Sequence, residues 1–197
     1  MAQSINTIRL LQQSLQLSIK DGAFCIDATA GNGHDTLFLA QLVGPQGRVL
    51  AMDIQPAALA ATEALLEKHG LRQRVELVLD GHENMGRYGE PGTVDGIMFN
   101  LGYLPGGDHS IATKADTTIG ALEAGLTLLK PLGILSLAIY HGGDTGFGER
   151  DAVLAWLRQL DSNRYTVLVT DFYNRPNHPP LAVRIIKEAG KKAGKEA

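Results

Sequence analysis

The amino-acid sequence predicts an α/β fold in which a doubly wound sheet of seven strands ends in an antiparallel hairpin. Short apolar runs alternate with helical patterns of about 10–15 residues, which is typical of parallel β-α-β units. The runs at residues 23–27, 94–99 and 133–140 are largely apolar, as expected of strands that helices cover on both faces. No helical pattern separates the last two runs, 165–172 and 181–187, so at least one of them should pair antiparallel. Together these features indicate a Rossmann-like sheet.

The chain opens with an amphipathic helix at residues 5–19, in which isoleucine and leucine recur at helical spacing. The sequence leaves open whether its apolar face packs on the sheet of the same chain or on a second copy in a homodimer. Glycine and proline bound the later helices, because the turn 44–47 stops one and Pro56 and Gly70 bracket the next. The expected helices after the first are 35–43, 56–69, 118–130 and 149–160, and the expected strands are 23–27, 48–53, 75–79, 94–99, 133–140, 165–172 and 181–187.

Length and composition indicate one cytoplasmic domain over residues 1–197, with an N-terminal helical segment 1–20 and a frayed tail 189–197. The apolar runs are too short to cross a membrane, and no secretory leader is recognisable. The single cysteine, Cys25, excludes an intramolecular disulfide and lies in the first strand, where it should be a core residue. The net charge of -3 argues against broad nucleic-acid binding but not against a local basic rim around one site.

Polar residues and glycines gather where the parallel strands should end. Ligands of open α/β sheets bind beyond the carboxyl ends of the strands. Glycines in the turn after the first strand allow a tight bend and the close approach of a ligand to the backbone. The residues expected at these ends are Asp27, Gly31, Gly33, Asp53, Asp80 and Asn100. Their convergence predicts a cofactor site.

The turn after the first strand fits S-adenosyl-L-methionine better than NAD. A dinucleotide fingerprint needs a third glycine where this chain has Thr36, although Asp53 stands at the expected distance. Asp27 would face the pyrophosphate of NAD, which is unfavourable, whereas it would attract the cationic ammonium and sulfonium groups of S-adenosylmethionine. Asp53 would then bind the two ribose hydroxyls.

The end of the third strand should lie near the adenine. Asp80, followed by Gly81 and His82, could accept a hydrogen bond from the adenine amine, but a turn or helix-cap role explains Asp80 equally well. His82 is more often a surface histidine at such a position. His34 could cap the following helix, and Asn32 could stabilise the turn through its side chain.

The loop after the fourth strand indicates methyl transfer to a nitrogen. Asn100 could accept hydrogen bonds from an amine, and Tyr103 could stack on a base. The pattern is similar to the Asn-Pro-Pro-Tyr loop of amino methyltransferases, but here it reads Asn100-Leu-Gly-Tyr103 without the prolines. His141, after the fifth strand, could move a proton or simply satisfy a turn.

Hydrolase and metal interpretations have less support. The chain has no G-x-S-x-G motif. The set Asp108, His109, His141 and Asp144 lacks a recognisable metal-ligand spacing.

Five segments resemble the small bacterial class I methyltransferases that carry the family label rRNA methylase. They are Asp27-Ala-Thr-Ala-Gly-Asn-Gly-His-Asp-Thr36, Asp53-Ile-Gln55, Asn100-Leu-Gly-Tyr-Leu-Pro-Gly-Gly-Asp108, Tyr140-His-Gly142 and Asn177-His-Pro-Pro180. The resemblance implies S-adenosylmethionine as cofactor and the anticodon arm of tRNA as partner. The implied acceptor is the aminomethyl group of wobble 5-aminomethyl-2-thiouridine. In the family a lysine often follows the loop aspartate, and here His109 takes that position.

Residues and resemblance together predict two groups of site residues. Asp108 or His141 would assist proton loss from the acceptor amine, or the amine would bind already neutral. Alternatives kept open are an rRNA or small-amine acceptor and a non-catalytic nucleoside-binding module. An NAD oxidoreductase is disfavoured. The predicted cofactor-binding residues are Asp27, Ala28, Gly31, Asn32, Gly33, Asp35, Thr36, Asp53, Ile54, Gln55, Asp80, Gly81, His82 and Asn100, and the predicted acceptor-side residues are Asn100, Tyr103, Asp108 and His141.

Overall fold

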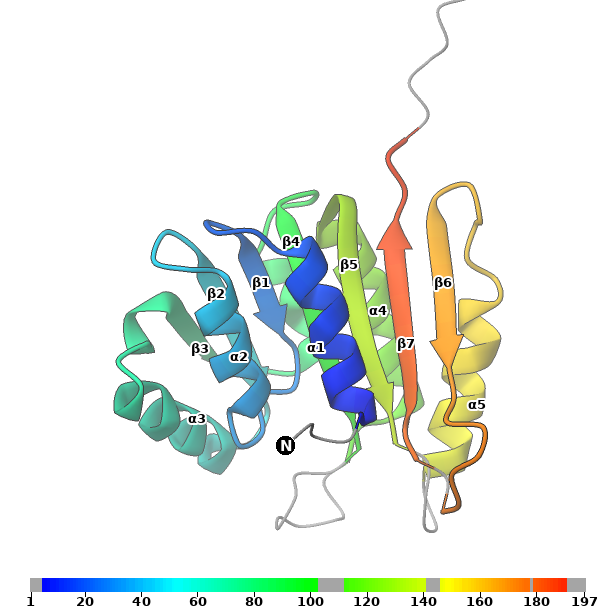
Figure 1. Ribbon diagram of the computed structural model, residues 1–197, viewed down its shortest axis with the longest axis horizontal. Helices are drawn as coiled ribbons and strands as arrows, with labels where there is room; N and C mark the ends of the chain where they lie inside the picture. The colour runs from blue at the N-terminus through cyan, green and yellow to red at the C-terminus, as the bar shows by residue number, and fades with distance from the viewer. Residues whose placement is uncertain (1–4, 103–111, 141–145, 178, 191–197) are drawn as a thin grey trace, which may run out of the picture.

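The computed structural model describes residues 5–102, 112–140, 146–177 and 179–190. A seven-stranded sheet with the order β3-β2-β1-β4-β5-β7-β6 forms its centre (Figure 1). The strands β1 to β5 run parallel, and β7 pairs antiparallel with both β5 and β6. The predicted doubly wound sheet with a terminal antiparallel hairpin is therefore confirmed. The strands are β1 (Phe24–Asp27), β2 (Arg48–Asp53), β3 (Val75–Leu79), β4 (Val94–Leu101), β5 (Leu129–Ile139), β6 (Tyr165–Thr170) and β7 (Leu181–Lys187).

Helices cover both faces of the sheet, and successive strand residues alternate between the two cores. In β1, Ile26 packs in a core with the helices α4 and α5, whereas Cys25 packs in a core with α1, α2 and α3. Burial raises the pKa of Cys25 to about 12, which agrees with its predicted core position. The helices are α1 (Thr7–Ser18), α2 (His34–Leu42), α3 (Pro56–Lys68), α4 (Ala115–Leu128) and α5 (Gly146–Leu157), with 3₁₀ turns η1 (Arg72–Arg74) and η2 (His82–Arg87).

Helix α1 packs on the sheet of its own chain, across β5 and β7 (Figure 1). Leu11 and Leu15 of α1 are fully buried in this contact. The approach at the end of the helix is close, since a Cβ on Gly96 would lie 2.8 Å from Cδ1 of Ile19. The hydroxyl of Thr7 donates to the carbonyl of Pro180 at 2.7 Å, which fixes the start of α1 beside the end of the parallel strands.

The largest departure from the predicted elements is at α4 and β5. The helix expected at residues 118–130 begins at Ala115 and ends at Leu128, and β5 follows directly at Leu129. The Lys-Pro-Leu-Gly segment after Leu129 spans the boundary between the helix expected to end at residue 130 and the strand expected to begin at residue 133. It belongs instead to a strand whose Leu132 has a φ of 66°.

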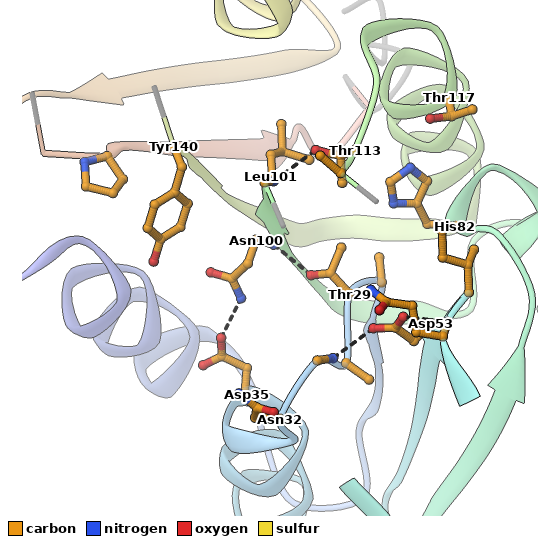
Figure 2. A pocket seen from close by; sticks show the side chains of 18 of the residues that line it. Thr29, Asn32, Asp35, Asp53, His82, Asn100, Leu101, Thr113, Thr117 and Tyr140 are labelled. Carbon is orange, nitrogen blue, oxygen red and sulfur yellow. Dashed lines mark hydrogen bonds between the residues drawn. The ribbon is translucent and has the colours of Figure 1, made fainter. Parts of the chain in front are cut away.

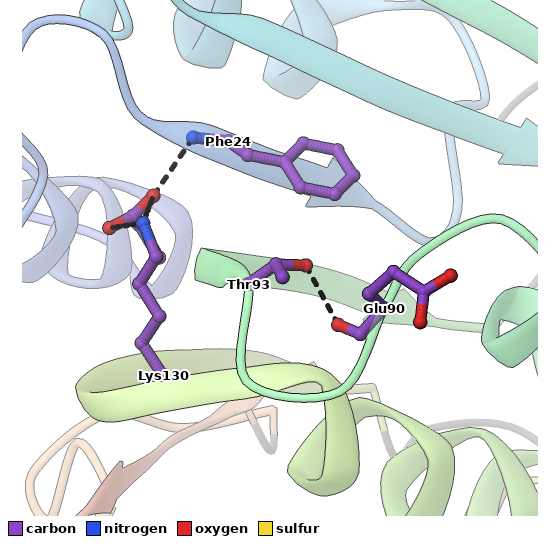
Figure 3. A network of polar contacts seen from close by, with 5 residues as sticks. Phe24, Glu90, Thr93 and Lys130 are labelled. Carbon is purple, nitrogen blue, oxygen red and sulfur yellow. Dashed lines mark hydrogen bonds and ion pairs between the residues drawn. The ribbon is translucent and has the colours of Figure 1, made fainter.

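Asp95 of β4 contacts β1 and β5 at the edge of the sheet where β1 begins, and Figure 3 shows its partners Phe24 and Lys130. Its carboxylate accepts the backbone N–H of Phe24 at 2.9 Å and the Nζ of Lys130 at 2.8 Å. The start of β5 is thereby tied to β1 and β4. This edge is opposite to the carboxyl ends of the parallel strands.

In the described part of the chain, no helix combines the length and apolar character that a membrane span needs.

Candidate functional site

A cavity of about 980 Å³ lies at the carboxyl ends of the parallel strands, around the switch in strand order between β1 and β4. Its size is within the range of small-molecule and cofactor sites. Figure 2 shows side chains from β2, β4, the turn after β1 and the position directly after β5 pointing into it. The predicted site residues that line it are Ala28, Gly31, Asn32, Asp35, Asp53, Ile54, Gln55, Asp80, Gly81, His82 and Asn100.

Asp27 and Thr36 lie behind the cavity wall rather than in it. Asp27 is fully buried and accepts the hydroxyl of Thr36 at 2.6 Å and the backbone N–H of Thr29 at 3.1 Å. Burial, followed by the nearby charge of Asp35, raises the pKa of Asp27 to about 7. The direct ligand contact expected of Asp27 and Thr36 is not the arrangement found, because the carboxylate turns inward and braces the turn.

Gly33 also lies outside the cavity wall, so it makes the expected tight turn but not the expected close approach to a ligand. It is the N-cap of α2 and has a φ of 81°. A Cβ there would lie 2.8 Å from Cα of Thr62 on α3. The missing side chain therefore permits the packing of α2 against α3, not the approach of a ligand. His34, considered as a cap, is instead the first residue of the helix.

Asp53 links the end of β2 to the turn after β1. One carboxylate oxygen accepts the N–H of Gly31 at 2.9 Å, and the other accepts the N–H of Gln55 at 2.9 Å. These backbone donors fix the carboxylate at the cavity wall (Figure 2). An ionised carboxylate has further acceptor capacity on each oxygen, so Asp53 can still accept from a pair of ligand hydroxyls.

The end of β3 combines both interpretations considered for Asp80. The carboxylate lines the cavity and also accepts from Asn84 and Tyr88, each at 2.8 Å. The hydrogen bond from Tyr88 is the main reason why the pKa of Asp80 is lowered. The surface position considered for His82 is wrong, because its side chain is buried and its ring centre lies 5.9 Å from that of Phe99. Burial lowers the pKa of His82, which favours the neutral imidazole.

Asn100, near the end of β4, is held on two sides (Figure 2). Its backbone N–H donates to Oγ1 of Thr29 at 2.8 Å, and its Nδ2 donates to Oδ2 of Asp35 at 2.6 Å. Its Oδ1 is buried without a hydrogen-bond partner in the described structure. A buried acceptor without a partner costs about 1–3 kcal/mol, so this atom favours a ligand that donates a hydrogen bond.

Helix α1 and the position directly after β5 contribute cavity residues that are not among the predicted site residues. Gln12 of α1 donates from Nε2 to Oδ1 of Asp35 at 2.7 Å, and Ile8 lies beside it in the wall. Tyr140 follows β5, is 45% exposed, and turns its ring to the cavity, where partial burial and the charge of Asp35 raise the pKa of its phenol (Figure 2). No local feature of the sequence indicates that Gln12 lines the cavity. The position of Tyr140 at a strand end could have indicated that Tyr140 does.

Thr113 and Glu149 fasten the ends of the segment that follows β4. The hydroxyl of Thr113 accepts the N–H of Gly102 at 2.9 Å and donates to Glu149 at 2.8 Å. Thr118 donates to the other oxygen of Glu149 at 2.7 Å. The predicted acceptor-side residues Tyr103, Asp108 and His141 lie outside the described residues, as do His109 and Asp144.

The charge of the described cavity wall favours a cationic ligand. The carboxylates of Asp35, Asp53, Asp80 and Glu83 line it together with one lysine, Lys114. Carboxylates at short range attract an ammonium or sulfonium group and repel a phosphate.

Comparison with protein families gives a match over residues 49–186 to the family described as "Putative rRNA methylase". A similar protein is the chloroplastic tRNA (mnm(5)s(2)U34)-methyltransferase of Arabidopsis thaliana, 39% identical over 86% of this chain. The ribosomal RNA small subunit methyltransferase H of Shewanella loihica is 31% identical over 49% of this chain. The aligned regions span 65% of the plant protein and 31% of the bacterial one.

Two crystal structures are similar over nearly the whole chain. One, from Clostridium thermocellum and with the same family description, is 46% identical with a TM-score of 0.91, and the match covers 94% of this chain and 100% of that one. The other, from Streptococcus mutans in complex with SAH, is 36% identical with a TM-score of 0.85 and coverage of 94% and 99%.

Proposed function

The chain belongs to the rRNA methylase family of S-adenosylmethionine-dependent methyltransferases, and we propose that it methylates an aminomethyl nitrogen of RNA. The proposed acceptor is wobble 5-aminomethyl-2-thiouridine in the anticodon arm of tRNA. The observation that carries the proposal is Oδ1 of Asn100, a buried acceptor without a partner in the described part of the cavity. A cytoplasmic location and a homodimer remain predictions.

The residues present fit S-adenosylmethionine, which supplies a methyl group on a cationic sulfur. Asp53, held by two backbone donors, would bind the ribose hydroxyls. Gly31 and Asn32 would approach the methionine part of the cofactor, and Asp80 or the backbone of Gly81 and His82 would face the adenine. The carboxylates of the wall favour the positive charges of the cofactor over a phosphate-bearing ligand.

Positioning is the main contribution that this chain would make to the transfer. Oδ1 of Asn100 would accept an N–H of the neutral amine and aim its lone pair at the methyl carbon. The nitrogen–carbon bond would then form while the carbon–sulfur bond breaks. The electron pair of the carbon–sulfur bond would stay on the sulfur to give S-adenosylhomocysteine. The nitrogen releases one proton, for which Asp108 or His141 would be the acceptor. Positioning of this kind can contribute ~7 kcal/mol or more.

The choice of a tRNA acceptor has separate support. The Arabidopsis relative is named for the wobble 2-thiouridine, and its aligned region covers 86% of this chain. The relative from Shewanella is named for ribosomal RNA, but it aligns with 49% of this chain, so an rRNA acceptor is the second candidate. Tyr103 would stack on the base, a contact worth roughly 1–3 kcal/mol.

The test is to incubate the protein with labelled S-adenosylmethionine and tRNA that carries 5-aminomethyl-2-thiouridine, and then to analyse the digested nucleosides. We expect the label in 5-methylaminomethyl-2-thiouridine. Absence of label from tRNA, with S-adenosylhomocysteine binding measured separately, would overturn the tRNA assignment and direct the test to rRNA and small amines. An RNA acceptor should also make KM rise steeply with salt, whereas a small amine should not.

The cofactor assignment has its own test. Asp53→Asn should weaken S-adenosylhomocysteine binding by about 10- to 100-fold, because hydrogen bonds to a charged partner are worth ~1.5–3 kcal/mol. Asp171→Asn is the matched control, since Asp171 is exposed and outside the cavity wall. Equal affinities for the two variants in calorimetry would contradict the role proposed for Asp53.

A further inference from the structure

We propose that Gln12 of the N-terminal helix is a positioning residue for the transfer, acting through Asp35 to hold Oδ1 of Asn100 toward the acceptor nitrogen. The inference rests on the proposed function and adds to it a residue from α1 that the sequence motifs do not include. Its basis is a continuous set of hydrogen bonds from α1 through α2 to β4.

The three side chains meet at one carboxylate. Nε2 of Gln12 donates to Oδ1 of Asp35 at 2.7 Å, and Nδ2 of Asn100 donates to Oδ2 at 2.6 Å. All three residues line the cavity, and Asp35 is 8% exposed. Asp35 thus has one amide donor on each oxygen, and neither contact depends on a residue outside the described structure.

The carboxylate decides which way the Asn100 amide faces. An ionised carboxylate only accepts hydrogen bonds, so the NH₂ group of Asn100 must turn toward Asp35. Oδ1 must then turn away from Asp35, and it is this atom that has no partner in the described structure (Figure 2). An asparagine in this orientation recognises an N–H donor, which is what an amine acceptor brings.

Gln12 fixes the carboxylate itself. Without its Nε2 donor, one oxygen of Asp35 would face a low-dielectric wall unpaired, and the side chain would rotate or draw water into the cavity. Either change would release the amide of Asn100 from its single orientation. The effect should reach the acceptor side and not the ribose contact at Asp53, which depends on the backbone donors of Gly31 and Gln55.

The experiment compares Gln12→Met with Gln13→Met in the full chain. Methionine keeps the length of the side chain but removes the amide, and Gln13 is the exposed neighbour on the same helix. We expect the single-turnover rate of methyl transfer to tRNA to fall about 10- to 100-fold for Gln12→Met. The affinity of Gln12→Met for S-adenosylhomocysteine should match that of the wild type, and Gln13→Met should match the wild type in every measurement.

Side-chain amide NMR gives a readout that does not depend on turnover. The Nδ2 resonances of Asn100 are assigned by their absence in Asn100→Asp. In the wild type they should form one pair, shifted by the carboxylate partner. In Gln12→Met this pair should shift or double. A Gln12→Met enzyme that transfers methyl at the wild-type rate would overturn the inference and leave the proposed function intact. A Gln12→Met enzyme that binds S-adenosylhomocysteine more weakly but keeps the wild-type transfer rate would also overturn the inference. If the wild type transfers no methyl to any amine, the proposed function fails. Independently of turnover, an unchanged Asn100 resonance in Gln12→Met would refute the inference that Gln12 positions Asn100 through Asp35.

Discussion

Two neighbouring carboxyl groups, Asp27 and Asp35, have different tasks because they face different surroundings. Asp27 is fully buried and braces the turn through Thr29 and Thr36. Asp35 reaches the cavity and takes an amide donor on each oxygen. Burial raises the pKa of both groups, and in Asp35 the two amide contacts oppose this effect. The motif identifies a carboxylate-rich turn, but partner geometry decides which carboxylate meets the ligand.

The raised pKa of Asp27 predicts a pH dependence of stability. Its pKa is about 7 in the folded protein against 3.8 for an unperturbed aspartate. Between these values the folded state holds a proton that the unfolded state has released. This group therefore favours the folded state fully at low pH, and that contribution is lost as the pH rises through about 7.

The Asp27→Asn variant has no ionisable group at this position, so it should not lose stability as the pH rises in the way the wild type does. The stability of the variant relative to the wild type should rise by roughly 2–4 kcal/mol between about pH 4 and pH 8 and then level off. Denaturant unfolding at a series of pH values measures the difference. A difference that does not change with pH would show that Asp27 titrates at an ordinary pKa in the folded protein.

At the scale of elements, the turn between β1 and α2 is shaped by the contact of two helices. Gly33 combines a left-handed φ with a position against the backbone of Thr62. The same turn presents the N–H of Gly31 to Asp53. The packing of α2 on α3 therefore controls the position of the cavity wall.

Gly33→Ala and Gly70→Ala separate packing from backbone conformation. Both glycines have positive φ, but a Cβ on Gly70 would meet nothing within 4 Å. Gly70→Ala should cost about 1–2 kcal/mol for the left-handed conformation. Gly33→Ala should cost about 1–3 kcal/mol more, because α3 must move. It should also weaken S-adenosylhomocysteine binding, while Gly70→Ala should not. Equal losses of unfolding free energy would argue against the helix contact.

At the scale of the whole molecule, the carboxyl and amino ends of the parallel strands have separate roles. The cavity occupies the carboxyl ends of the parallel strands, and the Asp95 cluster joins β1, β4 and β5 at the other edge (Figures 1 and 3). Helix α1 lies across β5 and β7 and brings Gln12 to the cavity. The site is therefore assembled from segments that are far apart in the sequence.

Asp95→Ala should reduce stability without changing cofactor binding. The variant leaves the N–H of buried Phe24 and the ammonium of Lys130 without their shared partner, at a cost of about 1–3 kcal/mol. S-adenosylhomocysteine affinity should be unchanged, since the cluster is remote from the cavity. Glu90→Ala is the control, because it removes an exposed side chain and keeps the backbone carbonyl that Thr93 contacts. A lower affinity in Asp95→Ala at a temperature where it remains folded would show that the two edges are coupled.

The sequence by itself determined the alternation of strands and helices, the antiparallel hairpin and the polar residues at the strand ends. These follow from local periodicity and turn chemistry, which act within a few residues. Most predicted cofactor residues line the cavity for this reason, because parallel strands end at the same edge. The boundary of α4 and β5 misled, where a turn-like composition lies inside a strand, and α5 begins and ends three residues before its expected bounds.

The tertiary structure decided which side chains at that edge can meet a ligand. Asp27 and Thr36 turn inward and Gly33 packs against α3, whereas Gln12 and Tyr140 turn into the cavity. The difference depends on helix packing and on hydrogen bonds such as Gln12 to Asp35, which join residues far apart in the chain. Burial and partner choice are set by these long-range contacts, so no local pattern in the sequence could reveal them.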